Sequence, residues 1–384
     1  ATVIADNIVD EANLKVSNAP TNGYFLSAQS GAAGGLTWAD ASGGGSALEL
    51  YAENPSTPTN PTAGGTNSVA IGNNAVVTTA GSGSTGDKSI AIGHNSSITS
   101  ANAIGAGRQA TVSGAYASGF GYKATSAGTQ SHATTNSYAS GTNSFAAAIA
   151  NNTSSYGATG AKSIALGDRA KATNSNTLAA GSITTSSGGD GSTALGYISS
   201  ATNLASFSAG NYVTASGKWS QAIGFEATTQ SISGKLAKAS GNFSTAGDAQ
   251  YGVLVLRQAT TDATPKTLIS EITPFVTTGN ATNQIILPNN SAYSFSGTIV
   301  GREKASEGTD CCAFKVEGLI RREGSAGTTV LVNSATTVLD NTPSWGMALS
   351  ADTTNGGLAI TVTGASSTNI RWVATIHTSE VTYS

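Results

Sequence analysis

A ten-residue stretch, NSVAIGNNAV at Asn67–Val76, decides the fold, because its central motif returns along the chain. The motif is a hydroxyl residue, a mostly apolar residue, Ala, then Ile or Leu, then Gly. It recurs in KSIAIGHNSS at Lys88–Ser97, in KSIALGDRAK at Lys162–Lys171 and in SQAIGFEATT at Ser220–Thr229. No catalytic chemistry requires so short and apolar a pattern to be repeated. The repetition therefore predicts a periodic scaffold.

The composition favours an ordered all-β chain with small side chains in its core. Of the 384 residues, 10% are charged and 47 are Gly, against roughly 25% charged residues in typical soluble domains. Disordered chains usually combine high net charge with few β-branched residues. This chain instead has a formal net charge of −3 and abundant Val, Ile and Thr. No segment concentrates basic residues as a nucleic-acid-binding face requires, so we expect no nucleic-acid partner.

The glycines of the motif recur with a period close to 14 residues. From Gly167 to Gly224 the successive separations are 14, 15, 14 and 14 residues. A helical repeat needs about 33 residues or more, so this period fits one coil of a β-solenoid, with two short strands and two turns. Roughly 13 such coils would make a shaft about 60 Å long. We expect the glycines to open turns at positive φ. The predicted turn glycines are Gly72, Gly93, Gly107, Gly167, Gly181, Gly196, Gly210 and Gly224.

Alternation along each short strand separates small from large apolar side chains. It places Val69 and Ile71 on one face of the strand and Ala70 on the other. We expect Ala to fill the narrow interior of the coil, while rows of Ile and Leu face outward. Exposed aliphatic rows mark an association site, and three chains that place these rows on a common axis would cover them. The predicted trimer-core positions are Val69, Ile71, Ile90, Ile92, Ile164, Leu166, Leu195 and Ile223.

The prolines mark the domain boundaries. The chain has eight, but none occurs among the 203 residues that follow Pro61. Because Pro is excluded from central strands, this stretch suits continuous stacked sheet. We therefore predict an N-terminal module at 1–50, a Pro- and Gly-rich linker at 51–66, a repeat shaft at 67–248 and a C-terminal domain at 249–384.

The C-terminal domain has a different texture. About seven segments of 5–10 residues, from YGVLVLRQAT at Tyr251–Thr260 to IRWVATIHTSEVTYS at Ile370–Ser384, read as strands separated by turn clusters. This pattern predicts an antiparallel β-sandwich or jelly roll. We expect Trp372 to lie in its core and Trp345 to plug its end.

Residues that could bind metal or act as nucleophiles are few. The histidines have no ligand spacing, and we expect His94 and His132 in turns or on the surface and His377 half-buried in a strand. We expect Cys311 and Cys312 to be buried as small hydrophobic residues, with an inter-chain bridge as the alternative. We predict no catalytic, cofactor-binding or metal-ligating residue and no cofactor.

A glycan-cleaving enzyme would need paired carboxylates. The C-terminal candidates are Glu303, Glu307, Asp310, Glu317 and Glu323, and we interpret them as a solvated charged loop and strand edge. The predicted shaft holds only five acidic residues, too few for a catalytic groove. The chain is therefore predicted not to be an enzyme. A tailspike that degrades polysaccharide is the alternative.

The repeats carry a resemblance to a known family. With their SVAIG, SIAIG and SIALG cores, residues 67–248 resemble the head repeats of trimeric autotransporter adhesins, least clearly at 108–160. This resemblance implies a left-handed parallel β-roll trimer. Glu11–Ser42 looks like the N-terminal modules of bacteriophage tail fibres, and 251–381 looks like a C-terminal domain of phage fibre and tail proteins. Together they resemble a trimeric phage tail fibre or receptor-binding protein.

The resemblance implies a structural and adhesive role on the virion. The predicted fold is an all-β homotrimer with a β-roll shaft and a C-terminal sandwich. Residues 1–50 would bind virion tail or capsid proteins. The shaft and C-terminal domain would recognise a host cell-surface glycan or protein, through residues that the sequence does not identify. A capsid-attached head fibre is an alternative.

The expected localisation follows from the same resemblance. The chain opens without a signal peptide, so we expect synthesis in the host cytoplasm and incorporation into a tail fibre or other surface appendage. No apolar run approaches the ~18 residues of a membrane span, so we expect no membrane insertion.

Overall fold

The computed structural model describes residues 24–28, 36–40, 59–78, 86–271, 278–341 and 343–383. In these ranges the chain is almost entirely β, with one 3-10 turn at Ala326–Thr328.

Two units divide the chain, 1–58 and 59–384. In the first, β1 (Tyr24–Ala28) pairs antiparallel with β2 (Leu36–Asp40). The rest of the predicted 1–50 module and residues 51–58 of the predicted linker lie outside the described residues.

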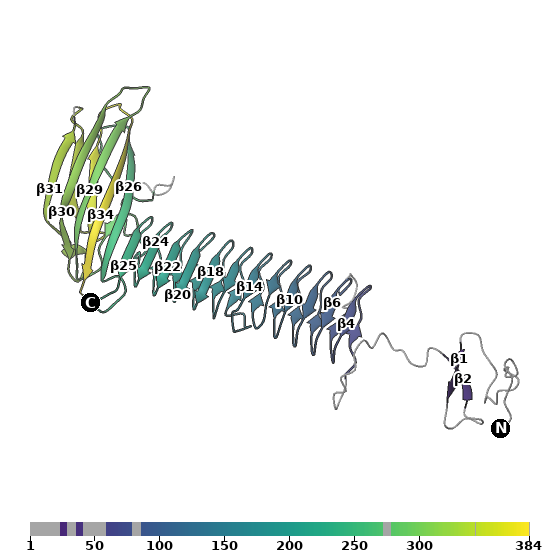
Figure 1. The fold of residues 1–384 in the computed structure, drawn as a ribbon. Helices are drawn as coiled ribbons and strands as arrows, with labels where there is room; N and C mark the ends of the chain where they lie inside the picture. Colours follow the sequence, from purple (N-terminus) through teal and green to yellow (C-terminus); the bar gives the residue numbers. More distant parts are fainter. Residues whose placement is uncertain are drawn as a thin grey trace, which may run out of the picture. The chain divides into compact units, whose positions relative to one another are not determined.

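The second unit begins with a parallel β-solenoid of about 12 turns (Figure 1). Its strands form two ladders in which each strand pairs with the equivalent strand of the next coil. The prediction of an all-β chain built on a parallel solenoid is confirmed. Pairing already begins at Thr62, in the segment that the sequence suggested as a linker. The loop insertion expected between Gly72 and Gly93 falls partly on 79–85, outside the described residues.

The first ladder contains the motif strands. They are β4 (Val69–Ile71), β6 (Ile90–Ile92), β8 (Ile104–Ala106), β10 (Ser118–Phe120), β12 (His132–Ala133), β14 (Phe145–Ala147), β16 (Ile164–Leu166), β18 (Leu178–Ser182), β20 (Thr193–Tyr197), β22 (Phe207–Asn211), β24 (Gln221–Phe225) and β25 (Leu236–Ser240).

The second ladder contains eleven two-residue strands. They are β3 (Thr62–Ala63), β5 (Val76–Val77), β7 (Ser97–Ile98), β9 (Thr111–Val112), β11 (Thr125–Ser126), β13 (Tyr138–Ala139), β15 (Gly157–Ala158), β17 (Lys171–Ala172), β19 (Thr185–Ser186), β21 (Ser200–Ala201) and β23 (Thr214–Ala215).

Small side chains fill the space between the ladders. The central Ala of the motif points inward and is fully buried at Ala91, Ala165 and Ala222. The hydroxyl residue before each strand is also buried and donates to the turn carbonyl three residues earlier. Examples are Ser163 to Gly160 and Ser220 to Gly217, both at 2.7 Å. The motif thus combines a thin apolar interior with a hydroxyl that satisfies a buried carbonyl.

The motif glycines lie where successive coils approach most closely. All eight predicted glycines have positive φ, from +103° at Gly167 to +143° at Gly107. A Cβ atom on Gly210 would overlap the carbonyl oxygen of Gly224 in the next coil. Later in the solenoid these glycines stand within the strands rather than after them, because Gly196 and Gly210 pair across β20 and β22. Both the backbone angle and the stacking therefore require Gly.

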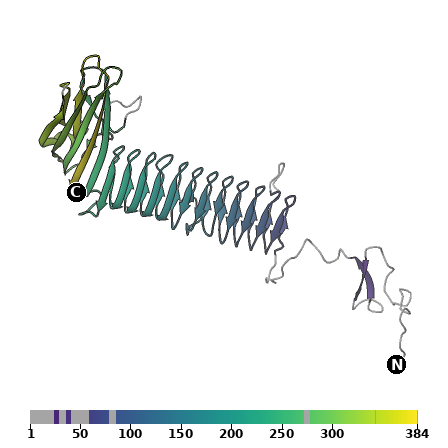
Figure 2. The same ribbon diagram turned by 45° about the horizontal axis from the view of Figure 1, so that its top comes forward.

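The first ladder continues into the C-terminal region through antiparallel pairing. After β25 come β26 (Ala249–Thr260), β34 (Ile370–Thr382), β29 (Ser291–Glu303), β30 (Cys311–Arg322) and β31 (Val330–Asp340), each hydrogen-bonded to the next. A smaller antiparallel sheet has β33 (Gly357–Thr363) paired with β32 (Gly346–Asp352), β27 (Lys266–Thr267) and β28 (Ile285–Ile286). Figure 2 shows the long strands beyond the last coil from a second direction.

One hydrophobic cluster fills the C-terminal region and includes side chains from both sheets. Trp372 is fully buried, its Nε1 donates to Thr260 Oγ1 at 3.0 Å, and its ring meets Trp345 edge-on with centroids 5.6 Å apart. The core position predicted for Trp372 is confirmed. Of the two cysteines, Cys312 is buried and Cys311 is exposed. The prediction that both are buried is therefore wrong for Cys311, because neighbouring residues of a strand point to opposite faces.

We expect Gly210→Ala to destabilise the chain, by about 1–3 kcal/mol from backbone strain alone, because φ is +141° and the methyl group meets the next coil. Thermal unfolding followed by circular dichroism measures the effect. The matched control is Gly324→Ala, whose added Cβ has no atom within 4 Å. Equal melting temperatures for the two variants would contradict the stacking role of Gly210.

Candidate functional site: the apolar face of the solenoid

The outward side chains of the first ladder, from β4 to β25, form an exposed surface that we call the apolar face. Register stacks Val69, Ile90 and Ile104 in one row, and Ile71, Ile92 and Ala106 in a second. Because Ala points inward on these strands, the larger aliphatic groups must point outward. The exposed fraction is 43% at Val69, 40% at Ile92 and 38% at Ile104. No other part of the described chain covers these rows.

The eight positions predicted for a trimer core all lie on the apolar face. Val69, Ile92 and Ile164 are exposed, and the other five, Ile71, Ile90, Leu166, Leu195 and Ile223, are partly exposed. None of them is buried within the single chain, whereas the Ala between each pair is inside the coil or partly so.

An aromatic cluster interrupts the aliphatic rows. His132 in β12 stacks on Phe145 with centroids 5.1 Å apart and an interplanar angle of 14°, and it lies 5.6 Å from the Phe120 ring. Its Nδ1 is 2.6 Å from Ser118 Oγ. Burial lowers the pKa of His132. The expected turn or surface position of His132 is wrong, because the shorter coil at this point moves it into a ladder position. Aligning the coils to place His132 opposite Ser118 would have revealed the cluster.

The edge strand β31 exposes apolar side chains in the C-terminal region. None of its residues is buried, and the exposed fraction is 44% at Val330, 48% at Val332, 57% at Val338 and 58% at Leu339. An exposed aliphatic edge strand is prone to pair or pack with another chain. The sequence predicts a strand here but not the exposure of both its faces.

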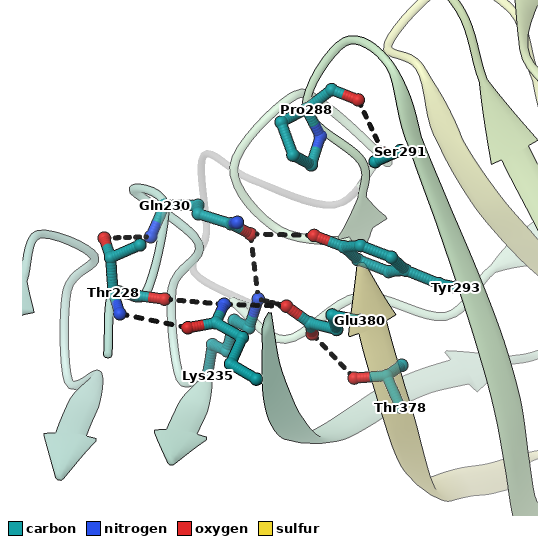
Figure 3. A network of polar contacts seen from close by, with 9 residues as sticks. Thr228, Gln230, Lys235, Pro288, Ser291, Tyr293, Thr378 and Glu380 are labelled. Atoms are coloured by element: carbon teal, nitrogen blue, oxygen red, sulfur yellow. Dashed lines mark hydrogen bonds and ion pairs between the residues drawn. The ribbon is translucent and has the colours of Figure 1, made fainter. Parts of the chain in front are cut away.

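A buried polar network joins the last coil to the C-terminal strands (Figure 3). Lys235 Nζ, with 0% of its side chain exposed, lies 2.7 Å from Glu380 Oε2. It also donates to Gln230 Oε1 at 2.9 Å, and Tyr293 Oη donates to the same oxygen at 3.0 Å. Thr378 Oγ1 donates to Glu380 Oε1 at 2.6 Å. Every charge in this network is therefore paired and hydrogen-bonded, as burial requires.

The surroundings of the network shift two pKa values. Burial lowers the pKa of Lys235, and the neighbouring Glu380 carboxylate opposes that change. Burial and the same carboxylate raise the pKa of Tyr293 well above its usual value. Because Lys235 and Glu380 are 145 residues apart, spacing along the sequence could not identify them as partners.

The other candidate residues of the sequence are dispersed. His94 is exposed in a turn, and His377 is exposed in β34 beside Tyr251, so its predicted half-burial is wrong. Glu303, Glu307 and Asp310 lie around one loop after β29. Within the described ranges, no group of three or more His, Cys, Asp or Glu side chains is arranged to hold a metal ion. No helix in the described ranges has the length and apolarity needed to cross a bilayer.

Comparison with protein families matches the repeats. Two copies of the YadA head domain repeat match residues 63–96 and 158–182. No curated protein matches the chain.

A tailspike is among the solved structures that match. It is the tailspike protein gp49 from Acinetobacter baumannii bacteriophage Fri1, a capsular polysaccharide depolymerase, with a TM-score of 0.24 and 11% sequence identity. The match covers 76% of this chain and 47% of that chain, so this chain spans about half of its length. At this TM-score the similarity carries no argument about activity.

The prediction that the chain is not an enzyme is nevertheless corrected by this match, because the matched tailspike is described as a depolymerase. The prediction depended on the scarcity of acidic pairs close in sequence. The pairing of Lys235 with Glu380 shows why that reasoning fails: folding brings charged side chains together across 145 residues. Polysaccharide cleavage therefore has to be measured.

We expect Lys235→Met to destabilise the chain by about 3–5 kcal/mol, because Glu380 is left buried without its cation. Denaturant unfolding measures the loss, and Lys235→Met/Glu380→Gln should recover part of it. The control is Lys315→Met, which breaks the exposed pair with Glu317 and should cost about 1 kcal/mol or less. Equal costs for the two lysines would contradict the role of the network.

We expect His132 to make stability depend on pH. Because the folded chain lowers the pKa of His132, folding disfavours the protonated ring. Stability should therefore fall as the pH drops below about 6.5, the ordinary pKa of His, and the loss should level off below the folded pKa. The melting temperature of His132→Phe should fall less than that of the wild type between about pH 7.5 and about pH 5. His94→Gln, at an exposed turn, should behave as the wild type.

Proposed function

We propose that this chain is the subunit of a homotrimeric receptor-binding fibre of a bacteriophage, with the apolar face of each solenoid turned toward a common axis. The observation that carries the proposal is the exposure of continuous aliphatic rows along the first ladder. Large exposed apolar rows are uncommon on soluble monomers and mark association surfaces. The matching YadA head domain repeats support the same arrangement.

The regions of the chain would have separate roles in the fibre. Residues 1–50 would attach to other virion proteins, 51–66 would act as a linker, and 67–248 would form the left-handed shaft. Residues 249–384, as a β-sandwich, would carry receptor contacts. The phage-fibre resemblance of Glu11–Ser42 and of 251–381 supports this division and a location on the virion. The exposed strand β31 offers a second place for contact between the copies.

The ligand of the fibre would be a host surface polysaccharide. Three equivalent sites on one trimer would bind a repeating polymer with higher avidity than one site, without new contacts at any single site. The purified full chain, incubated with capsular polysaccharide, would be tested for binding and for released reducing ends in the same samples. Release of oligosaccharides would make the protein a depolymerase, and retention without release would make it an adhesin.

We expect the wild-type chain, of 37.9 kDa, to sediment as a trimer and Ile104→Asp/Ile164→Asp to yield monomers or aggregates. The reason is that six carboxylates would be placed in an apolar contact without partners. Sedimentation velocity at micromolar concentration measures the change.

The control is Thr111→Asp, which adds the same charge in the same coil as Ile104 but on the second ladder, where Thr111 is exposed. This variant should remain trimeric. A monomeric wild type, or a trimeric double variant, would contradict the proposal.

A further inference from the structure

A basic cavity lies at the far end of the long C-terminal strands. It has a volume of about 580 Å³ and is lined by Thr260 and Thr261 after β26, by Arg302 and Lys304 after β29, and by Asn369 and Arg371 at the start of β34. This volume is within the range of small-ligand sites. The cavity lies six residues along β26 from Val253, the last residue paired with the solenoid, or about 20 Å.

Two arginines stand directly opposite each other in this cavity. Arg302 of β29 and Arg371 of β34 are register partners, and both are exposed on the same face of the sheet. Side chains in this relation have Cβ atoms about 4.5–5.5 Å apart, and like charges there destabilise the sheet. The neighbouring Lys304 adds a third positive charge, against one carboxylate, Glu303, in the lining. An anion bound between the two guanidinium groups would remove this repulsion.

The carboxylates near the cavity are engaged by the loops that frame it. Glu307 accepts hydrogen bonds from Asn369 N at 2.8 Å and from Asn369 Nδ2 at 2.7 Å. These bonds lower the pKa of Glu307 and keep it ionised. Glu303 accepts the N–H of Asp310 at 3.2 Å. The carboxylates therefore hold the loops in place instead of neutralising the arginine pair.

The two arginines differ in how much of their hydrogen-bonding capacity is used. Arg302 Nη1 donates to the Asp310 carbonyl at 2.9 Å, which ties its side chain to the loop. Arg371 makes no side-chain hydrogen bond or ion pair with any residue in the described ranges. Its planar fork matches a carboxylate or phosphate with two parallel hydrogen bonds. The arrangement is thus one anchored and one free guanidinium group facing the same space.

We propose that this cavity binds the anionic group of an acidic saccharide, with Arg371 as the principal ligand and Arg302 and Lys304 supporting it. The assignment to a saccharide rests on the proposed function as a receptor-binding fibre. The anion site itself rests on the arginine pair. Thr261 and the Asn369 backbone offer polar groups for the sugar hydroxyls beside the anion. A trimer would carry three such sites.

The experiment uses the full-length chain and defined probes. Binding of tetragalacturonic acid, of its methyl ester and of inorganic phosphate is measured by isothermal titration calorimetry. The variants are Arg371→Gln and the matched control Arg257→Gln, an exposed arginine on the same face that does not line the cavity. The wild type and Arg257→Gln should bind equally. Arg371→Gln and esterification of the ligand should each weaken binding by about tenfold or more.

The two anions identify the source of the charge. Tighter binding of tetragalacturonate assigns the site to a sugar carboxylate, and tighter binding of phosphate assigns it to a phosphorylated saccharide. Failure of both to bind the wild type, or equal binding by Arg371→Gln, would overturn the site. Sedimentation of the same samples keeps the two proposals apart: a trimer that binds neither anion removes only the site, and a monomer that binds removes only the trimeric fibre.

Discussion

The close stacking of successive coils is the constraint on which the solenoid depends. Parallel strands of neighbouring coils lie about 4.8 Å apart, and at the motif glycines the backbones approach so closely that a Cβ atom would overlap the next carbonyl oxygen. The two ladders leave room inside for Ala, as at Ala91 and Ala165. Burying a methyl group contributes far less than burying a Leu or Ile side chain, at about 0.8 kcal/mol per CH₂. Each coil therefore gains little from its own interior.

This weakness inside the coil explains the chemistry outside it. The larger aliphatic groups of the motif, such as Ile92 and Ile164, are placed on the outer surface, where the single chain leaves about two fifths of each exposed. A second chain can supply there the burial that the interior cannot. Because β25 pairs with β26, the surface that carries these rows continues into the long C-terminal sheet without a break in hydrogen bonding. At the other edge of that sheet, β31 exposes aliphatic groups of the same kind.

Periodic features of the fold could be predicted from the sequence, because every coil repeats the same physical requirements. The 14-residue period and the alternation of Ala with Ile or Leu predict the solenoid and the outward rows. The predicted core position of Trp372 follows from strand alternation alone. Features that occur once were missed. Nothing in the sequence near Lys235 indicates Glu380, and the place of His132 depends on a coil of unusual length. The predicted absence of enzymatic activity failed for a related reason, since it treated separation in sequence as separation in space.

The junction between the solenoid and the long strands shows how the end of a parallel ladder can be protected. The last strand of an open ladder exposes unpaired backbone groups and invites further pairing. Here β26 turns back along β25 and pairs with it from Leu236 to Lys238, so that edge is covered by the same chain. The Lys235–Glu380 pair fixes the join from inside, where both side chains are dry. One end of β26 and β34 is thus held rigidly on the last coil, while their other end presents Arg371 about 20 Å away. A binding group placed on strands anchored in this way is held in position by backbone hydrogen bonds along its whole support, and not by a loop alone.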